Sequence, residues 1–139
     1  MTFSSRNLRL IAQSFAEDHR LVLSEHLNQY GFLFGCYLLM WIDEIALMAA
    51  SLNFRECPFV TVDMKEVASH RSVREGAVLS FETRQIHREK TSVRYSANVL
   101  REDEEIFSTE VTQVGVDELG QKQSLPNGGF FVSLPLPNL

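Results

Sequence analysis

A carboxylate pair interrupts the most apolar stretch of the chain. Asp43 and Glu44 lie within residues 31–50, where nearly every other side chain is apolar. On a helix, the residues three and four positions from Asp43 are all apolar: Leu39, Met40, Ala46 and Leu47. Carboxylates are rarely buried unless they are paired or functional, and burial tends to raise their pKa and basicity. Asp43 is therefore a candidate catalytic group. The alternative is a structural carboxylate that caps a loop or meets an arginine at a subunit contact.

Glu44 is the weaker of the two candidates. It lies about 100° round the helix from Asp43, so the two carboxylates cannot point the same way. Two glycines, Gly31 and Gly35, precede the same segment and allow a tight turn or a close approach to a ligand. The backbone N–H groups of a helix that begins there could stabilise an oxyanion. The alternative is a plain tight turn.

The elements that must position these groups follow from periodicity. Residues 36–52 are too long for a buried strand and rich in Ala, Leu and Met, so we predict a helix. Because it is apolar all round, we expect protein to enclose it rather than a membrane, whose centre would penalise Asp43 and Glu44.

Strands are predicted on both sides of this helix. Residues 7–15 fit either a helix or a strand, and residues 19–24 fit a short strand. After the helix, strands are predicted at residues 59–67, with Val60, Val62 and Met64 on one side, and at 77–87, 91–101 and 106–116. Residues 102–105 are predicted to form an acidic turn. Short connections imply an antiparallel sheet. The predicted fold class is α+β, with a curled antiparallel sheet round one long central helix.

Composition limits the class of protein. The 139 residues suit one domain, predicted at 1–126, with an irregular tail at 127–139. A net charge of −5 argues against nucleic-acid binding. Two cysteines are too few for a disulfide scaffold, and residues 1–20 lack the pattern of a signal peptide, so a cytoplasmic location is expected. The spacing of the four histidines fits no metal motif, and we expect no metal. One sheet and one helix leave an edge strand and apolar surface uncovered, which favours a homodimer or an oligomer of dimers.

The segment NQYGFLFGCYLLMWID, residues 28–43, resembles the signature of the hotdog-fold acyl-CoA thioesterases. That signature reads Asn-x-x-Gly-x-x-Phe-Gly-Gly, six mainly apolar residues, then Asp. Further similarity lies in VTVDMKEV (60–67), REKTSVRYSANV (88–99) and VGVDELGQKQSLP (114–126), so it spans roughly residues 20–126. The second glycine of the pair is replaced by Cys36. A later Asn- or Asp-Phe pair and a proline are replaced by Ala68, Ser69 and Ser72.

The resemblance implies a hotdog fold and hydrolysis of an acyl-CoA to a free acid and CoA, without a metal or redox cofactor. Asp43 would act as a general base on water or attack the thioester carbonyl directly. Asn28 would face Asp43 of the partner and orient the water or the carbonyl. The N–H groups of Gly35 and Cys36 would face the oxyanion.

A basic cluster is the candidate site for the CoA phosphates. Residues 70–94 hold six of the thirteen Lys and Arg residues. The candidates for binding CoA are Arg71, Arg74, Arg88, Lys90, Thr91 and Ser92. The alternative is a solvated strand surface on which these cations pair with local glutamates.

Three other functions fit the same fold. A thioesterase for acyl carrier protein would differ only in its substrate. A hydratase or dehydratase is disfavoured because the helix start lacks the expected histidine. A protein that binds acyl-CoA without hydrolysing it stays open because of Ala68, Ser69 and Ser72.

Overall fold

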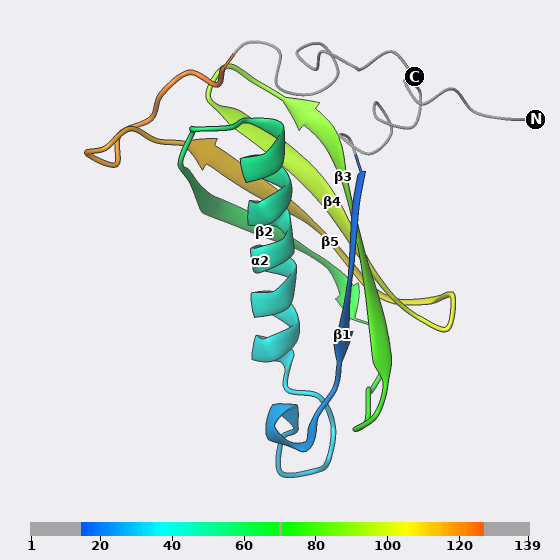
Figure 1. Cartoon of the computed structure of the whole chain (residues 1–139). Coiled ribbons are helices and arrows are strands. Elements are labelled where there is room, and N and C mark those ends of the chain that lie inside the picture. Colours follow the sequence, from blue (N-terminus) through cyan, green and yellow to red (C-terminus); the bar gives the residue numbers. More distant parts are fainter. Residues whose placement is uncertain (1–14, 70, 127–139) are drawn as a thin grey trace, which may run out of the picture.

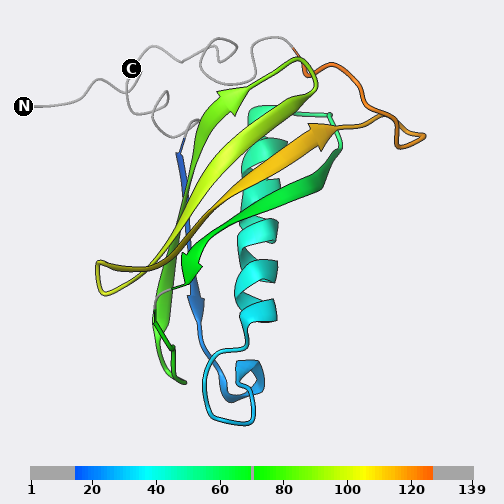
Figure 2. The ribbon, with the colours of Figure 1, turned by 180° about the vertical axis from the view of Figure 1, so that it is seen from behind.

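The computed structural model describes residues 15–69 and 71–126, and its strands form a single five-stranded antiparallel sheet. The elements in chain order are β1 (Phe15–Leu21), η1 (Ser24–His26), α2 (Gly35–Asn53), β2 (Phe59–Ser69), β3 (Val78–Arg88), β4 (Ser92–Arg101) and β5 (Glu104–Gly115). Their order across the sheet is β1-β3-β4-β5-β2, so β1 and β2 are the two edge strands. The sheet curls round α2, which lies against its concave face (Figures 1 and 2).

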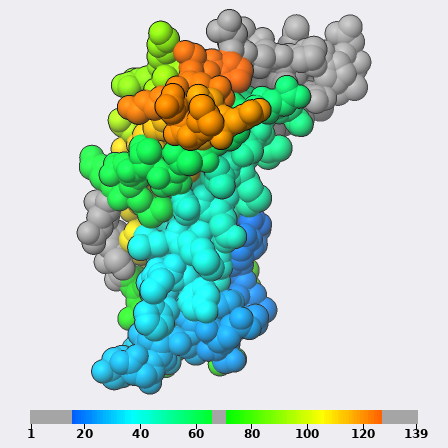
Figure 3. Space-filling view, turned by 90° about the vertical axis from the view of Figure 1, so that its left-hand side faces the viewer, coloured from blue at the N-terminus to red at the C-terminus, as the bar shows by residue number. Residues whose placement is uncertain are grey.

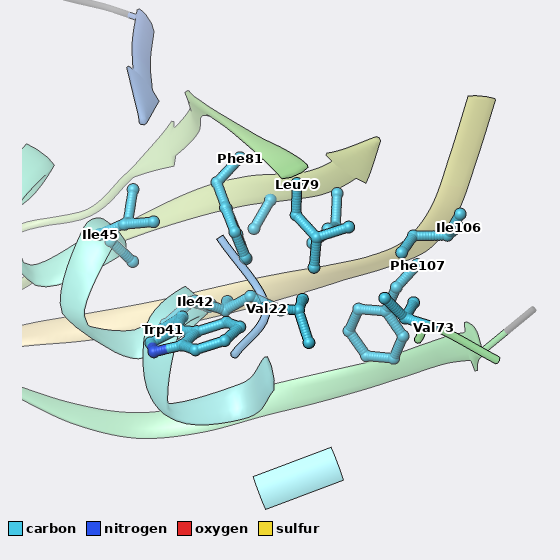
Figure 4. Packing of buried hydrophobic residues seen from close by; sticks show 13 residues of the cluster. Val22, Trp41, Ile42, Ile45, Val73, Leu79, Phe81, Ile106 and Phe107 are labelled. Atoms are coloured by element: carbon cyan, nitrogen blue, oxygen red, sulfur yellow. The ribbon is translucent and has the colours of Figure 1, made fainter. Parts of the chain in front are cut away.

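The core lies between one side of α2 and the concave face of the sheet. The predicted alternation of β4 is confirmed, because its inward residues Val93, Tyr95, Ala97 and Val99 are all buried. Helix α2 contributes the buried residues Trp41, Ile42, Ile45, Ala46, Ala49 and Ala50. In Figure 4 the side chains of Trp41 and Ile42 lie among strand residues such as Phe81 and Leu79. Each large apolar side chain buried in this way contributes roughly 1.5–3 kcal/mol to folding.

The predicted boundaries are close to the observed ones, with two differences. The first strand begins at Phe15 and ends at Leu21, earlier than predicted, because Ser24 already belongs to η1. The acidic turn is also shorter than predicted. Within residues 102–105 only Glu102 and Asp103 have positive φ, which suits a two-residue hairpin turn, and the next two glutamates begin β5. The predictions for residues 7–14 and for the tail at 127–139 lie outside the described residues.

The predicted alternation of β2 is wrong, because the strand contains a bulge. The pairing register of β2 with β5 shifts between Thr61 and Asp63. Val60 is exposed, whereas Met64 packs against the core beside its pairing partner Val111. An extra residue in one strand reverses which side the later side chains face. Val60 and Met64 therefore do not share a face.

Helix α2 is covered on one side only within this chain. Its opposite side leaves large apolar side chains between 37% and 63% exposed: Leu39, Met40, Leu47, Met48 and Leu52. This surface faces the viewer in Figure 3, where the helix is cyan. The expectation that protein encloses the helix all round is not met by one chain, because a single sheet covers a single side. The helix is long enough and apolar enough, with a mean hydropathy of 1.4, to cross a membrane. The core helix of a soluble protein can have the same length and hydropathy.

The buried hydroxyl of Tyr95 gives the fold a predicted sensitivity to alkali. Burial raises the pKa of Tyr95 well above its ordinary value of 10.0, and the hydrogen bond from Asn53 opposes this rise only in part. The unfolded chain therefore loses this proton first, so the stabilisation is complete below about pH 10 and decreases as the pH rises further. We expect the free energy of unfolding to fall more steeply above pH 10 in the wild type than in Tyr95→Phe, by up to about 1.4 kcal/mol per pH unit. Urea unfolding at a series of pH values measures this difference, and parallel curves would contradict it.

Candidate active site

Asp43 lies near the middle of α2 and points toward the edge strand β2. The hydroxyl of Thr61 donates a hydrogen bond to Oδ1 of Asp43, and Thr61 Oγ1 accepts one from Nε2 of Gln113 at 2.8 Å. Asp43 is half-buried and Thr61 is exposed, so this part of the molecule is open to solvent. The expectation that Asp43 is buried among apolar neighbours is therefore wrong for the single chain, because Leu39, Met40 and Leu47 lie on the uncovered side of the helix.

The β-bulge sets this arrangement. Thr61 pairs with Gln113 across β2 and β5, and both side chains face the helix. Beyond the bulge, Asp63 pairs with Thr112, and both residues line a depression elsewhere on the surface. Neither Thr61 nor Gln113 was predicted from the sequence as a site residue. Two features of the sequence could have indicated them: a threonine two positions after the buried Phe59, and a glutamine within an alternating strand.

Asn28 shapes the loop that leads into α2. Its Oδ1 accepts hydrogen bonds from the backbone N–H groups of Tyr30, at 2.9 Å, and Phe32, at 3.1 Å. Gly31 donates its N–H to the Asn28 carbonyl and has a φ of 83°, which glycine adopts without strain. The side-chain amide nitrogen of Asn28 has no partner among the described residues. Asn28 thus has an observed structural role and a nitrogen donor left for a ligand.

His26 holds the same loop against the helix. Its carbonyl accepts the N–H of Phe34, which is the N-cap of α2, at 2.9 Å. Its ring packs edge-on against the rings of Tyr37 and Trp41, with centroids 4.9 Å away in each case. The position of Asn28 relative to the helix is therefore fixed from both ends of the loop.

The N-terminus of α2 presents backbone donors to solvent. Phe34 makes no side-chain capping bond, and the first turn contains no acidic residue. Gly35 and Cys36 are both exposed, and the first N–H groups of a helix have no acceptor within the helix. A Cβ added at Gly35 would meet nothing within 4 Å, so this chain's own packing does not require glycine there.

These two parts of the site do not meet within one chain. Asp43 follows Gly35 by eight residues, which corresponds to about 12 Å along the helix axis. That distance is too long for one carbonyl group to contact both Asp43 and the first N–H groups of the same helix. Glu44 is exposed and has no hydrogen-bond or ion-pair partner in the part of the chain that the structure describes.

The predicted CoA-binding residues form two separate groups. Arg71 pairs with Glu104 at 3.4 Å, and the Arg74 guanidinium lies 4.6 Å from the ring centroid of Phe32, beside the N-terminus of α2. Arg88 lies at the other end, 4.9 Å from the ring centroid of Phe54, the C-cap residue, and donates to the Pro126 carbonyl at 2.7 Å.

The remaining three CoA candidates lie near Arg88. Backbone carbonyls of Lys90 and Thr91 accept hydrogen bonds from Leu125 and Gly115, and Ser92 begins β4. The nineteen residues of α2, about 28 Å of helix, separate this group from Arg71 and Arg74. One chain therefore does not bring the six candidates together.

The described residues contain no group of three or more His, Cys, Asp or Glu side chains that could hold a metal ion. The cysteines are both free: Cys36 is exposed at the helix start, and Cys57 is buried beside the Pro58 carbonyl. Two surface depressions, one lined in part by Asp63 and Arg94 and the other by Glu56 and Glu118, do not include Asp43.

Sequence comparison identifies the family. The thioesterase superfamily matches residues 30–108, more than half of the chain and the part that carries Asp43 and Thr61. The chain belongs to the thioesterase superfamily. The hotdog fold predicted from the resemblance is confirmed by this match and by the curled five-stranded sheet round α2. No curated protein matches the chain.

Solved structures of this superfamily share the fold. An apo-hexameric acyl-CoA thioesterase is 28% identical, with a TM-score of 0.76 over 84% of this chain and 78% of that one. An acyl-CoA hydrolase from Staphylococcus aureus, in complex with butyryl coenzyme A and coenzyme A, is 21% identical, with a TM-score of 0.73 over 83% of this chain and 71% of that one. A hexameric thioesterase from Yersinia pestis is 22% identical, with a TM-score of 0.74 over 79% of this chain and 93% of that one.

Proposed function

We propose that this member of the thioesterase superfamily hydrolyses acyl-CoA thioesters to a free acid and CoA. The observation that carries the proposal is the hydrogen bond from Thr61 to Asp43, which holds a carboxylate in place on the central helix. Membership of the superfamily supports thioester chemistry, and the similar structures include proteins that hydrolyse acyl-CoA. A positioned carboxylate is the group that such hydrolysis needs.

The carboxylate can act by either of two routes. Oδ1 of Asp43 accepts from Thr61, and Oδ2 has no partner among the described residues, so Oδ2 is the atom that reacts. As a general base it takes a proton from water while the water oxygen adds to the thioester carbonyl carbon. When the C–S bond breaks, Asp43 returns the proton to the CoA thiolate. As a nucleophile, Oδ2 adds to the carbonyl and expels the thiolate, and water then cleaves the resulting anhydride.

A second copy of the chain completes the proposed site. The separation of about 12 Å between Asp43 and the N–H groups of Gly35 supports a reaction centre to which two chains contribute. We propose a homodimer, alone or in a larger oligomer, in which the exposed apolar side of α2 and the edge of β2 are covered. Asn28 and the helix N-terminus of one protomer would then face Asp43 of the other, with the N–H groups of Gly35 and Cys36 at the oxyanion.

The two basic groups would bind the CoA phosphates at the same composite site. Charge-assisted hydrogen bonds from Arg or Lys to phosphate are strong, and Arg74 and Lys90 are exposed cations without an acidic partner among the described residues. Arg71 and Arg88 already contact Glu104 and Pro126, so they would bind phosphate only by exchanging these partners. We also propose that the protein works in the cytoplasm, where its two free cysteines would stay reduced.

Release of free thiol tests the proposal directly. The protein is incubated with short-, medium- and long-chain acyl-CoAs, and with the same acyl groups on acyl carrier protein, and the released thiol of CoA or of the carrier protein is measured with a chromogenic disulfide. We expect turnover of at least one acyl-CoA, faster than that of its carrier-protein counterpart. Binding of acyl-CoA without thiol release would instead favour a binding protein, and a preference for the carrier-protein substrates would favour the carrier-protein thioesterase.

A further inference from the structure

Gln113 is a fully buried polar residue at the end of the hydrogen-bond chain that reaches Asp43. It lies on β5 opposite Thr61 and is 0% exposed. Its Nε2 donates to Thr61 Oγ1 at 2.8 Å, whereas its Oε1 is buried without a partner among the described residues. A buried acceptor without a donor destabilises the fold, so packing and stability alone do not account for an amide here.

The direction of this chain follows from the chemistry of its members. An ionised carboxylate can only accept hydrogen bonds, so the single hydroxyl proton of Thr61 is donated to Asp43. Thr61 Oγ1 can then only accept from its other neighbour. A donor is therefore required at position 113, and the side-chain amide of Gln113 supplies one. The buried N–H of Gln113 keeps the hydroxyl proton of Thr61 pointing at Asp43 rather than back toward β5.

We propose that Gln113 is a positioning residue that acts on Asp43 through Thr61 in thioester hydrolysis. The proposal rests on the function proposed above. Gln113 does not touch the substrate, because its side chain is wholly buried behind Thr61. Its effect falls on the orientation of the reacting carboxylate oxygen, and therefore on kcat rather than on KM.

Two substitutions at position 113 separate positioning from packing. Gln113→Met keeps the volume and removes both the donor and the unpartnered acceptor. We expect a melting temperature at least equal to that of the wild type, a kcat about tenfold lower and a KM within about twofold. Gln113→Glu replaces the donor by a carboxylate that competes for the Thr61 proton when ionised and donates to Thr61 when protonated. We expect its kcat, relative to that of the wild type, to rise as the pH falls from about 8 to about 5, which a packing defect would not produce.

A double-mutant cycle with Thr61→Val tests whether the effect passes through Thr61. We expect Gln113→Met to change kcat by less than about twofold in the Thr61→Val background, because no hydroxyl remains to be oriented. The proposal is overturned if Gln113→Met keeps wild-type kcat, or if it lowers kcat equally in both backgrounds.

If the wild type releases no thiol from any acyl-CoA, the proposed function fails. The same cycle measured by urea unfolding then decides whether positions 113 and 61 are coupled, and additive effects would overturn the coupling.

Discussion

Asp43→Asn is expected to lower the release of CoA thiol by at least about a hundredfold, the usual cost of losing a general base. Asparagine has nearly the same shape and can still accept the hydrogen bond from Thr61 through its Oδ1. It cannot take a proton from water, and its amide nitrogen cannot attack as a carboxylate oxygen does. The substitution therefore removes the reactive group under both routes while it keeps the local structure, and steady-state kinetics on the best acyl-CoA measures the loss.

Glu44→Gln is the matched control, since it neutralises the next carboxylate on the same helix. Glu44 is exposed and is not among the hydrogen-bond partners of Thr61 in the described residues, so we expect turnover within about threefold of the wild type. The assignment of Asp43 would be wrong if both variants retained activity, or if Glu44→Gln were the inactive one. Circular dichroism of the two variants establishes that each is folded.

Met48→Glu is expected to separate the subunits and to lower turnover by a factor comparable to that of Asp43→Asn. Met48 is 46% exposed on the uncovered side of α2, about 140° round the helix from Asp43. A charge introduced there stays hydrated in a monomer but would be buried and unpaired in the proposed dimer, which costs several kcal/mol. Because each reaction centre of the proposed dimer would take groups from two chains, dissociation should remove activity even though Asp43 is unchanged.

Sedimentation velocity and light scattering measure this second effect. Met48→Leu, which keeps the apolar character and approximate volume, should assemble and turn over like the wild type. A Met48→Glu protein that sediments with the wild type and keeps its activity would show that this side of the helix is not the subunit contact. A folded, monomeric and fully active variant would show that one chain suffices for catalysis.

The overall architecture was predictable because its strongest signals are local. The segment around Ile42 is too long and too apolar for a strand, and β4 alternates without interruption from Val93 to Val99. Neither signal depends on which strands pair. The position of Asp43 on a long apolar helix, which a loop carrying Asn28 precedes, follows from these local elements and from the superfamily signature.

The contacts of Asp43 were not predictable, because they depend on pairing between distant strands. A bulge depends on how β2 and β5 align, and no residue type near Val62 in the sequence indicates that one forms there. The partnership of Thr61 with Gln113, which are 52 positions apart, depends on the same alignment. The prediction that Asp43 is buried was wrong for the single chain for a related reason. The apolar sequence of a helix does not reveal whether its own chain or a second chain covers it.

The predicted CoA-binding residues form two groups within one chain, because residues that are close in sequence can lie at opposite ends of a strand. Between Arg74 and Arg88 the chain runs the length of β3, eleven residues or about 36 Å of strand. Basic residues at the two ends of that strand therefore belong to opposite ends of one protomer. In the proposed dimer, a neighbouring chain would bring both groups to one ligand.

The bulge in β2 lets a single strand supply both a residue of the candidate site and a residue of the core. Before the bulge, Thr61 faces the helix and serves the carboxylate, and after it Met64 faces the helix and fills the core. Thr61, Asp63 and Met64 pair with Gln113, Thr112 and Val111, so Val62 is the extra residue, and its removal would give a regular stretch of strand in which Thr61 and Met64 both still face the helix. A β2 strand that kept Val62 but lost the bulge would instead turn either Thr61 or Met64 away from the helix, because the two residues are three positions apart, and the protein would lose either the hydrogen bond to Asp43 or the core packing of Met64.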